Sequence, residues 1–184
     1  MSAKVRAFDW ASHPLGPMAG WPDTLRVVLE LMLASHFPKC LVWGERQTTF
    51  HNDAYRPLLG DKPDALGRPF PEVWHETWHL VGDMAQRALA GQASFWQDAP
   101  FTVQRHGYPE PTFFTFGFSP VRDVHGAVGG YVVTIIETTQ SNHAQQQLRA
   151  EASSLEQQVV QRTADRDRLW SLSDALMMVA RLAD

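Results

Sequence analysis

The sequence predicts an α+β domain built on a five-stranded antiparallel sheet, with one helix before the sheet and a long helix after it. Hydrophobic residues recur with a helical period up to about residue 36 and again before Gly91, whereas after Gly91 they alternate with a period of two. The composition changes at Gln140, after which neither Gly nor Pro occurs. Helical and strand segments arranged in this order are typical of an α+β domain.

The bulk composition describes a globular chain and excludes several classes of protein. Hydrophobic residues make up 44% of the 184 residues and charged residues 20%, which is enough for a real core. The net charge is -4 and no basic block occurs, so we expect no nucleic-acid partner. Cys40 is the only cysteine, so no intrachain disulfide is possible. Without an apolar run of membrane-spanning length or a signal-peptide core, we expect no membrane association and a cytoplasmic location.

Residues 1–36 are expected to form an N-terminal extension and a capping helix. Residues 1–20 are rich in Pro, Gly and Ala and lack periodicity, which indicates a loosely packed segment. Pro22 suits a first helical turn. A helix over 21–36 then follows from the spacing of four apolar residues, Leu25, Val28, Leu29 and Met32. Val27 and Leu31 widen this stripe, so we expect the helix to be covered on more than one side. We also expect it to cover one face of the sheet, within one chain or across a dimer.

Residues 37–139 contain the expected sheet and its short helices. Asn52 is a plausible N-cap for a short helix that Pro57 to Gly60 would end. A longer helix is expected from Pro71 or Glu72 to about Gly91, because its apolar residues recur with a helical period. These residues are Trp74, Trp78, Val81, Ala85 and Ala88. The expected strands are the run from Pro38 to Trp43 and the ranges 47–52, 94–105, 112–122 and 128–139.

Residues 140–184 are expected to form one long helix with coiled-coil character. Four leucines lie on a seven-residue lattice, in which Arg162 takes the place of the expected apolar residue. The seam consists of Leu148, Leu155, Val159, Leu169 and Leu176. A lone helix cannot bury such a seam, so we expect a partner helix and therefore a homodimer.

The order of these elements resembles the PAS domain, and in detail the PAS sensors at the front of bacterial histidine kinases and hybrid kinases. Five stretches that span most of the chain carry the resemblance. They are "HPLGPMAGWPDTLR", "FPKCLVWGERQTTFHNDAYRPLLG", "ALGRPFPEVW", "RALAGQASFWQDAPFTVQRHGYPEPTFFTFGFSPVRDVHGAVGGYVVTIIETT" and "QQVVQRTADRDRLWSLS".

The resemblance implies a sheet wrapped by short helices around a small cavity, with the last strand leading straight into a signalling helix. In the family this strand usually ends in Asp-x-Thr. Glu137, Thr138 and Thr139 stand at that point here, with Glu in place of Asp. Glu137 and Thr139 are therefore the expected signal-relay residues, which would join the strand end to the exit helix by hydrogen bonds.

The sequence His75-Glu76-Thr77-Trp78-His79 matches the H-E-x-x-H pattern of zinc peptidases. A third zinc ligand is missing, because Ala85 occupies its position in the extended pattern. We therefore expect no metal site and interpret the two histidines as residues on the side of an amphipathic helix. A haem ligated by His75 or His79 is a second, less favoured possibility.

Nine aromatic residues are candidates for the lining of the implied cavity. They are Trp43, Phe50, Tyr55, Trp78, Trp96, Phe101, Phe114, Phe116 and Phe118. We expect most of them to fill the core, with a small organic ligand as the candidate occupant and no resident cofactor. Cys40 lies in a strand without the helical Asn-Cys-Arg-Phe-like motif of a photoactive flavin thiol, so a buried core role is favoured.

These patterns predict a non-enzymatic module that senses a small molecule or partner and dimerises through its C-terminal helix, and through its N-terminal helix as well. The module would precede another PAS domain or a kinase domain in the same chain. The alternatives are a purely structural, ligand-free dimeriser and, less favoured, a zinc hydrolase using His75, Glu76 and His79.

Overall fold

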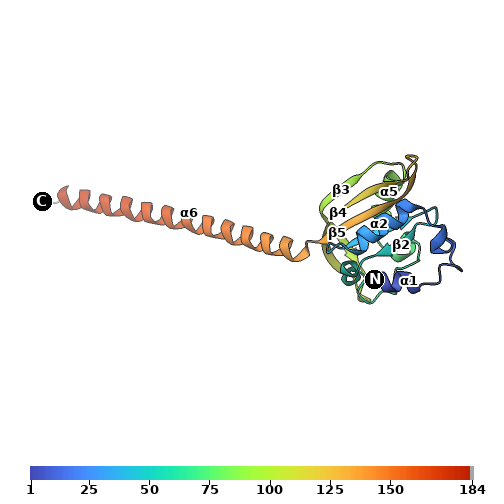
Figure 1. Ribbon diagram of the computed structural model, residues 1–184. Coiled ribbons are helices and arrows are strands. Elements are labelled where there is room, and N and C mark those ends of the chain that lie inside the picture. Colours follow the sequence, from blue (N-terminus) through green and yellow to red (C-terminus); the bar gives the residue numbers. More distant parts are fainter. Residues whose placement is uncertain (183–184) are drawn as a thin grey trace. The chain divides into compact units, whose positions relative to one another are not determined.

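A five-stranded antiparallel sheet forms the core of residues 1–139 in the computed structural model, as the sequence predicts (Figure 1). The structure describes the backbone of residues 1–182 and the side chains of residues 1–168 and 170. The strand order is β2-β1-β5-β4-β3. The strands are β1 (Lys39–Trp43), β2 (Thr48–His51), β3 (Ser94–Val103), β4 (Glu110–Arg122) and β5 (Val128–Glu137).

Each face of the sheet packs against its own set of helices and has its own hydrophobic core. One core contains α3 (Arg56–Leu59), α4 (Phe70–Val73) and α5 (Trp78–Leu89), of which α5 contacts three strands. On the opposite face lies α2 (Asp23–Leu33), which contacts β1 and β2 (Figure 1). The expected capping helix therefore covers the sheet of its own chain.

The side of α2 that faces away from the sheet is apolar and exposed. Leu25, Leu29 and Met32 are buried against the sheet, as their spacing predicts. Val27 and Leu31, however, are 65% and 70% exposed. The expectation that this helix is covered on more than one side is therefore wrong for the single chain.

The N-terminal extension is ordered and packed, which corrects the expectation of a loose segment. It forms α1 (Ser2–Ala7) and a short 3₁₀ turn, η1 (Met18–Gly20). Val5 and Trp10 are almost fully buried, and the Trp10 indole stacks on the Phe50 ring with centroids 5.1 Å apart. This packing depends on single large side chains rather than on a periodic stripe, which is why the sequence pattern does not reveal it.

The helix expected from Pro71 or Glu72 to Gly91 is also wrong, because residues 74–77 form a turn between α4 and α5. The Lys62 ammonium donates to the Val73 carbonyl at 3.1 Å and so occupies an acceptor at the end of α4. At Trp74 the backbone leaves the helical region, with φ -117° and ψ 37°, and the Thr77 amide and hydroxyl both donate to the Trp74 carbonyl.

A second compact unit, residues 140–184, follows the domain of residues 1–139. Its helix, α6 (Thr139–Leu182), contains 44 residues. Of the predicted seam, Leu148, Leu155 and Val159 are each at least 60% exposed. The side chains of Leu169 and Leu176 lie outside the described residues.

Candidate functional site: an apolar cavity and the end of β5

An apolar cavity of about 50 Å³ lies between the sheet and the helices α3, α4 and α5. Three side chains of its lining carry a polar atom, and each of these atoms already has a partner. Trp74 Nε1 donates to the Tyr55 hydroxyl at 2.8 Å, and Thr77 Oγ1 donates to the Trp74 carbonyl at 3.3 Å. The lining residues are Tyr55, Leu58, Phe70, Trp74, Thr77, Val81, Phe101, Val103, Phe114, Phe116, Phe118, Val133 and Ile135. This lining suits a very small, uncharged occupant.

Five of the nine predicted aromatic residues line this cavity. They are Tyr55, Phe101, Phe114, Phe116 and Phe118. Phe114, Phe116 and Phe118 of β4 lie on one face of the sheet because side chains two residues apart in a strand share a face.

Trp43 and Phe50 lie elsewhere, in the core between the sheet and α2. In β1 the cavity-side residues are Cys40 and Val42, so the alternation of the strand directs Trp43 to the other face. There its indole covers Gly129, where a Cβ would lie 2.5 Å from the ring. The prediction that Trp43 and Phe50 line the cavity is therefore wrong.

Trp78 and Trp96 do not line the cavity either. Trp78 begins α5 and packs edge-on against Phe70, with ring centroids 6.3 Å apart. Trp96 is 47% exposed and lies just before the irregularity of β3 between Trp96 and Ala99, which shifts the register of that strand. This irregularity interrupts the alternation of side chains along β3. The prediction that Trp96 lines the cavity, which assumed a regular strand, is therefore wrong.

Cys40 lies in β1 and is fully buried beside the cavity core. Burial raises the pKa of its thiol far above the ordinary range, so the thiol stays protonated. This agrees with a buried core cysteine in a strand, as the sequence indicates.

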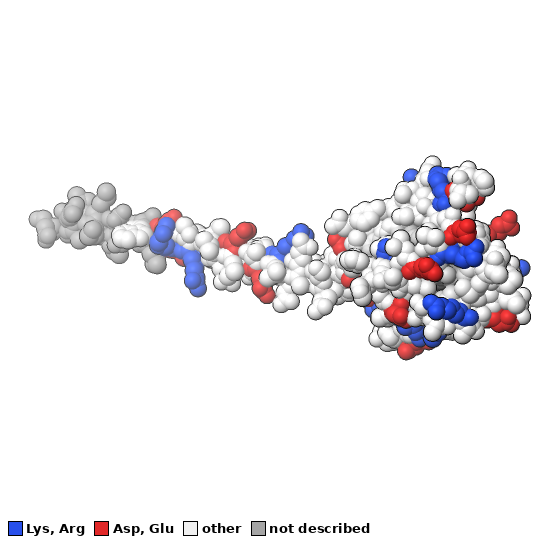
Figure 2. Space-filling model, viewed as in Figure 1, with Lys and Arg blue, Asp and Glu red and all other residues white. Residues whose placement is uncertain are grey.

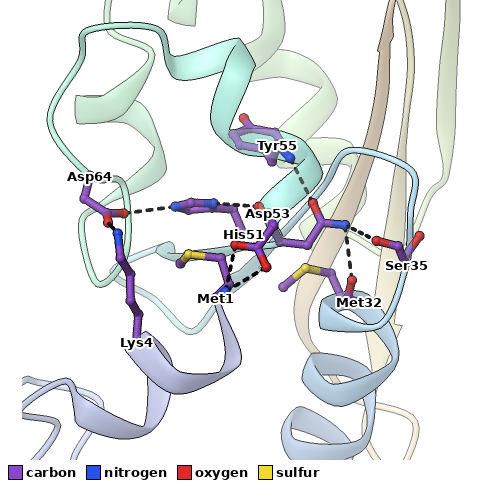
Figure 3. Close-up of polar contacts among 9 residues, drawn as sticks. Met1, Lys4, Met32, Ser35, His51, Asp53, Tyr55 and Asp64 are labelled. Carbon is purple, nitrogen blue, oxygen red and sulfur yellow. Dashed lines mark hydrogen bonds and ion pairs between the residues drawn. The ribbon is translucent and has the colours of Figure 1, made fainter.

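Asn52 joins the wall of the cavity to α2 and the loop after it, through partners that include Met32, Ser35 and Tyr55, which Figure 3 labels. Its Oδ1 accepts hydrogen bonds from the backbone amides of Tyr55 and Lys39, both at 3.1 Å, which confirms the predicted N-cap. Its Nδ2 donates to three carbonyls at the end of α2 and in the following loop, those of Met32, Ser35 and Phe37. Asn52 is itself fully buried.

A second polar chain beside Asn52 joins α1 to the sheet (Figure 3). The buried His51 ring lies 3.0 Å from both the Asn52 carbonyl and Asp64 Oδ1. Lys4 of α1 donates to the other Asp64 oxygen at 3.1 Å. Burial alone would raise the pKa of Asp64, but the hydrogen bonds from His51, the Leu66 amide and Lys4 lower it well below its usual value.

The end of β5 is tied to the β3–β4 hairpin by a bidentate ion pair. Arg105 donates from Nη1 to Glu137 Oε2 at 2.6 Å and from Nη2 to Glu137 Oε1 at 3.1 Å. Arg105 Nε also donates to Glu110 Oε2 at 3.1 Å. The Arg105 guanidinium lowers the pKa of Glu137, although burial opposes this shift. Arg105 was not among the predicted site residues, because the sequence of a hairpin turn does not distinguish an arginine that forms an ion pair from one that is solvated.

Thr139, the first residue of α6, is held at the same point. Its hydroxyl donates to Glu137 Oε1 at 3.0 Å and accepts from the Phe113 amide at 2.9 Å. The Thr138 amide donates to the Phe113 carbonyl at 2.7 Å. The Glu and Thr side chains are thus in hydrogen-bond contact at the end of the strand, despite the longer side chain of Glu.

The H-E-x-x-H residues do not form a zinc site in the described part of the chain. His75 lies in the turn before α5 with its side chain 76% exposed, whereas His79 lies in the first turn of α5. Glu76 pairs with Lys62 instead of facing a metal position. Among the described residues, no three His, Cys, Asp or Glu side chains gather closely enough to hold a metal ion. Neither histidine lines the apolar cavity, which argues against haem ligation there.

Comparison with known proteins identifies this architecture. Residues 36–143, more than half of the chain, match a family model described as PAS fold. The chain belongs to the PAS fold family. Comparison with curated protein sequences found no significant match.

Solved structures support the PAS assignment at the level of the fold. The PAS domain of Bordetella pertussis BvgS is 22% identical, with a TM-score of 0.50 over 72% of this chain and 98% of that one. An RNA-binding light-oxygen-voltage receptor is 21% identical, with a TM-score of 0.51 over 76% of this chain. Our chain covers 40% of that receptor's length. The Rhodobacter sphaeroides LOV protein is 14% identical, with a TM-score of 0.50 over 66% of this chain and 70% of that one.

The surface of the PAS unit carries both acidic and basic side chains (Figure 2). On the face shown in Figure 2, acidic and basic side chains alternate, as they do along the described part of α6. None of the helices in the described chain combines the length and apolarity that a membrane crossing requires.

Proposed function

We propose that this chain is the sensory and dimerisation module of a bacterial signal-transduction histidine kinase and has no catalytic activity of its own. A small apolar ligand or a partner would bias the PAS unit, and α6 would carry the bias to a further PAS or kinase domain. The kinase context rests on the resemblance of the sequence to PAS sensors.

The contacts of Glu137 with Arg105 and Thr139 carry this proposal. Ile135 lines the cavity two residues before Glu137 on the same strand, and Phe114, which also lines it, is the register partner of Glu137. A shift of the cavity wall therefore acts directly on the residues that hold the start of α6. Differential binding to two arrangements of this strand end would shift their populations.

Dimerisation is the second part of the proposal. The exposed seam of α6 supports a paired helix, because a seven-residue apolar lattice is stabilised by a partner helix. The exposed Val27 and Leu31 of α2 support a second contact between N-terminal helices. Arg162 interrupts the seam, which would weaken one register and keep two registers close in energy.

Xenon is a suitable probe of the coupling, because it occupies small apolar cavities without needing a polar partner. We expect xenon to bind in the cavity, as detected by ¹²⁹Xe NMR, and to change amide hydrogen exchange at residues 139–150. In the Arg105→Met variant, xenon should still bind while the exchange of residues 139–150 no longer responds. Arg122→Met is the matched control, since Arg122 lies at the β4–β5 hairpin and, among the described residues, donates only to the backbone carbonyls of Gly126 and Gly91. Unchanged exchange in the xenon-bound wild type would refute the coupling.

A ligand-free structural dimeriser is the alternative that one observation favours. The cavity volume of about 50 Å³ is well below the ~150 Å³ of an engineered apolar cavity that binds benzene. If neither xenon nor a screen of small apolar fragments binds while the chain still dimerises, this alternative replaces the sensory function.

A further inference from the structure

A surface hollow of about 480 Å³ lies beside the N-terminus of α5, separate from the apolar cavity. Its wall combines apolar residues, including Leu80 and Phe101, with polar residues. The polar residues are Glu76, His79, Thr102, Gln104 and Thr112. Phe101 also lines the apolar cavity, so its side chain forms a shared wall. The hollow therefore offers an apolar surface with a few polar groups, which is the usual composition of a small-molecule site.

Glu76 is the unusual residue in this hollow. Its side chain is 9% exposed, and Oε1 is ion-paired with Lys62. Within the described chain, Oε2 receives no hydrogen bond, and His75 Nδ1 lies 3.5 Å from it. A buried carboxylate oxygen without a donor costs free energy, so a ligand donor would find a vacant acceptor here.

The Glu76 carboxylate is held in its ionised form, so its oxygens act only as hydrogen-bond acceptors. Burial would raise the pKa of Glu76, but the hydrogen bond from Lys62 and the nearby backbone amides lower it overall. Lys62 is itself held by the Val73 carbonyl and lies 4.3 Å from the centre of the Trp74 ring. These fixed contacts keep the ammonium on the Oε1 side, which leaves Oε2 for a second donor.

We propose that this hollow is a second binding site, for a small molecule that carries an amine or similar N–H donor on an apolar body. The amine would donate to Glu76 Oε2, and the apolar body would pack on Leu80 and Phe101. The site is distinct from the apolar cavity, although Phe101 lines both.

The position of the hollow connects it to the start of α6. The backbone amide and carbonyl of Phe113 bond to Thr139 and Thr138, and Gln104 directly precedes Arg105. An occupant of the hollow would therefore lie against Gln104, which precedes Arg105, and against Phe113, which bonds Thr138 and Thr139. Binding there would reach the exit helix without passing through the apolar cavity.

The test uses 2-phenylethylamine as the probe and 3-phenylpropionate, which has an aromatic body and the opposite charge, as its counterpart. Binding to the full chain is measured by chemical-shift changes of backbone amides. We expect the amine to shift the amides of Gln104 and Phe113 saturably and the carboxylate to leave them unchanged. Equal shifts with both compounds would overturn the proposal.

Two variants with opposite expected effects separate a binding role of Glu76 from a structural one. Glu76→Gln keeps the shape and removes the charge, and it should weaken amine binding at least tenfold. Lys62→Met removes the competing ammonium, so it should tighten amine binding several-fold and increase the thermal shift produced by the probe. Glu30→Gln, in an exposed position of α2, is the matched control and should change neither value. Amine affinity that is the same in wild type and both variants would contradict the site.

Discussion

Among single residues, Asn52 makes contacts that join three parts of the PAS unit. Its side chain bonds the end of α2, the start of β1 and the backbone of Tyr55 in the cavity wall. Sequence analysis recognised its capping role because a cap is a local interaction. Its contacts with residues 32–37 depend on the packing of α2 against the sheet.

Replacing Asn52 with Ala should lower the free energy of unfolding by about 3 kcal/mol or more. Each buried group that loses its partner costs about 1–3 kcal/mol, and Asn52 serves two amides and three carbonyls. Chemical denaturation measures the change. Gln92→Ala removes an exposed amide and should stay within about 0.5 kcal/mol of the wild type. Equal stability of the two variants would show that the Asn52 network contributes little.

The lowered pKa of Asp64 predicts that acid weakens the contact between α1 and the sheet. Its pKa in the folded protein is lower than the ordinary value of 3.8, so its contribution to stability is complete above that value. The contribution is lost as the pH falls towards the lowered folded pKa. Urea unfolding between pH 6 and pH 2.5 should therefore show a shallower decline for Asp64→Asn than for wild type. Asp23→Asn, at an exposed position of α2, is the control and should keep the wild-type slope. An unchanged slope in Asp64→Asn would show that Asp64 does not cause the acid sensitivity.

At the scale of elements, the N-terminal segment behaves as part of the core. Trp10 packs on Phe50 and Trp21, and its indole N–H donates to the Val5 carbonyl at 2.7 Å. Trp10→Ala should therefore cost about 3–5 kcal/mol, the usual range for removing a buried indole. Guanidinium unfolding gives the value. Trp170→Ala, which truncates a 65% exposed tryptophan, is the matched control, and a cost below about 1 kcal/mol for Trp10→Ala would mean that the segment is loosely held.

The break between α4 and α5 explains why the zinc-peptidase pattern misleads. Two histidines four residues apart share a helical face only if the helix is continuous. Lys62, which is distant in sequence, bonds the Val73 carbonyl and pairs with Glu76, so residues 74–77 turn. Local periodicity does not contain this information, because a helical stripe continues across the break.

At the scale of the whole molecule, dimerisation through α6 is the main prediction. Leu148→Arg combined with Leu155→Arg places two charges in the seam, so the variant should be monomeric at concentrations where the wild type is dimeric. Sedimentation equilibrium measures the association. Gln146→Arg with Ser153→Arg adds the same charges to the opposite side of the helix and should leave the dimer intact. A wild type that is monomeric at high concentration would refute the paired helix.

Sequence periodicity was sufficient for the α+β class, for all five strands and for the exit helix, because these features depend on residues near one another in the chain. It also placed Phe114, Phe116 and Phe118 on one face, since alternation along a strand is a local property. Tertiary packing decided which face encloses the cavity and moved Trp43 and Phe50 to the other core. It also decided the partner of Glu137, because Arg105 reaches it from 32 residues away through the pairing of strands. Contacts of this kind depend on how separate elements meet, which no local pattern encodes.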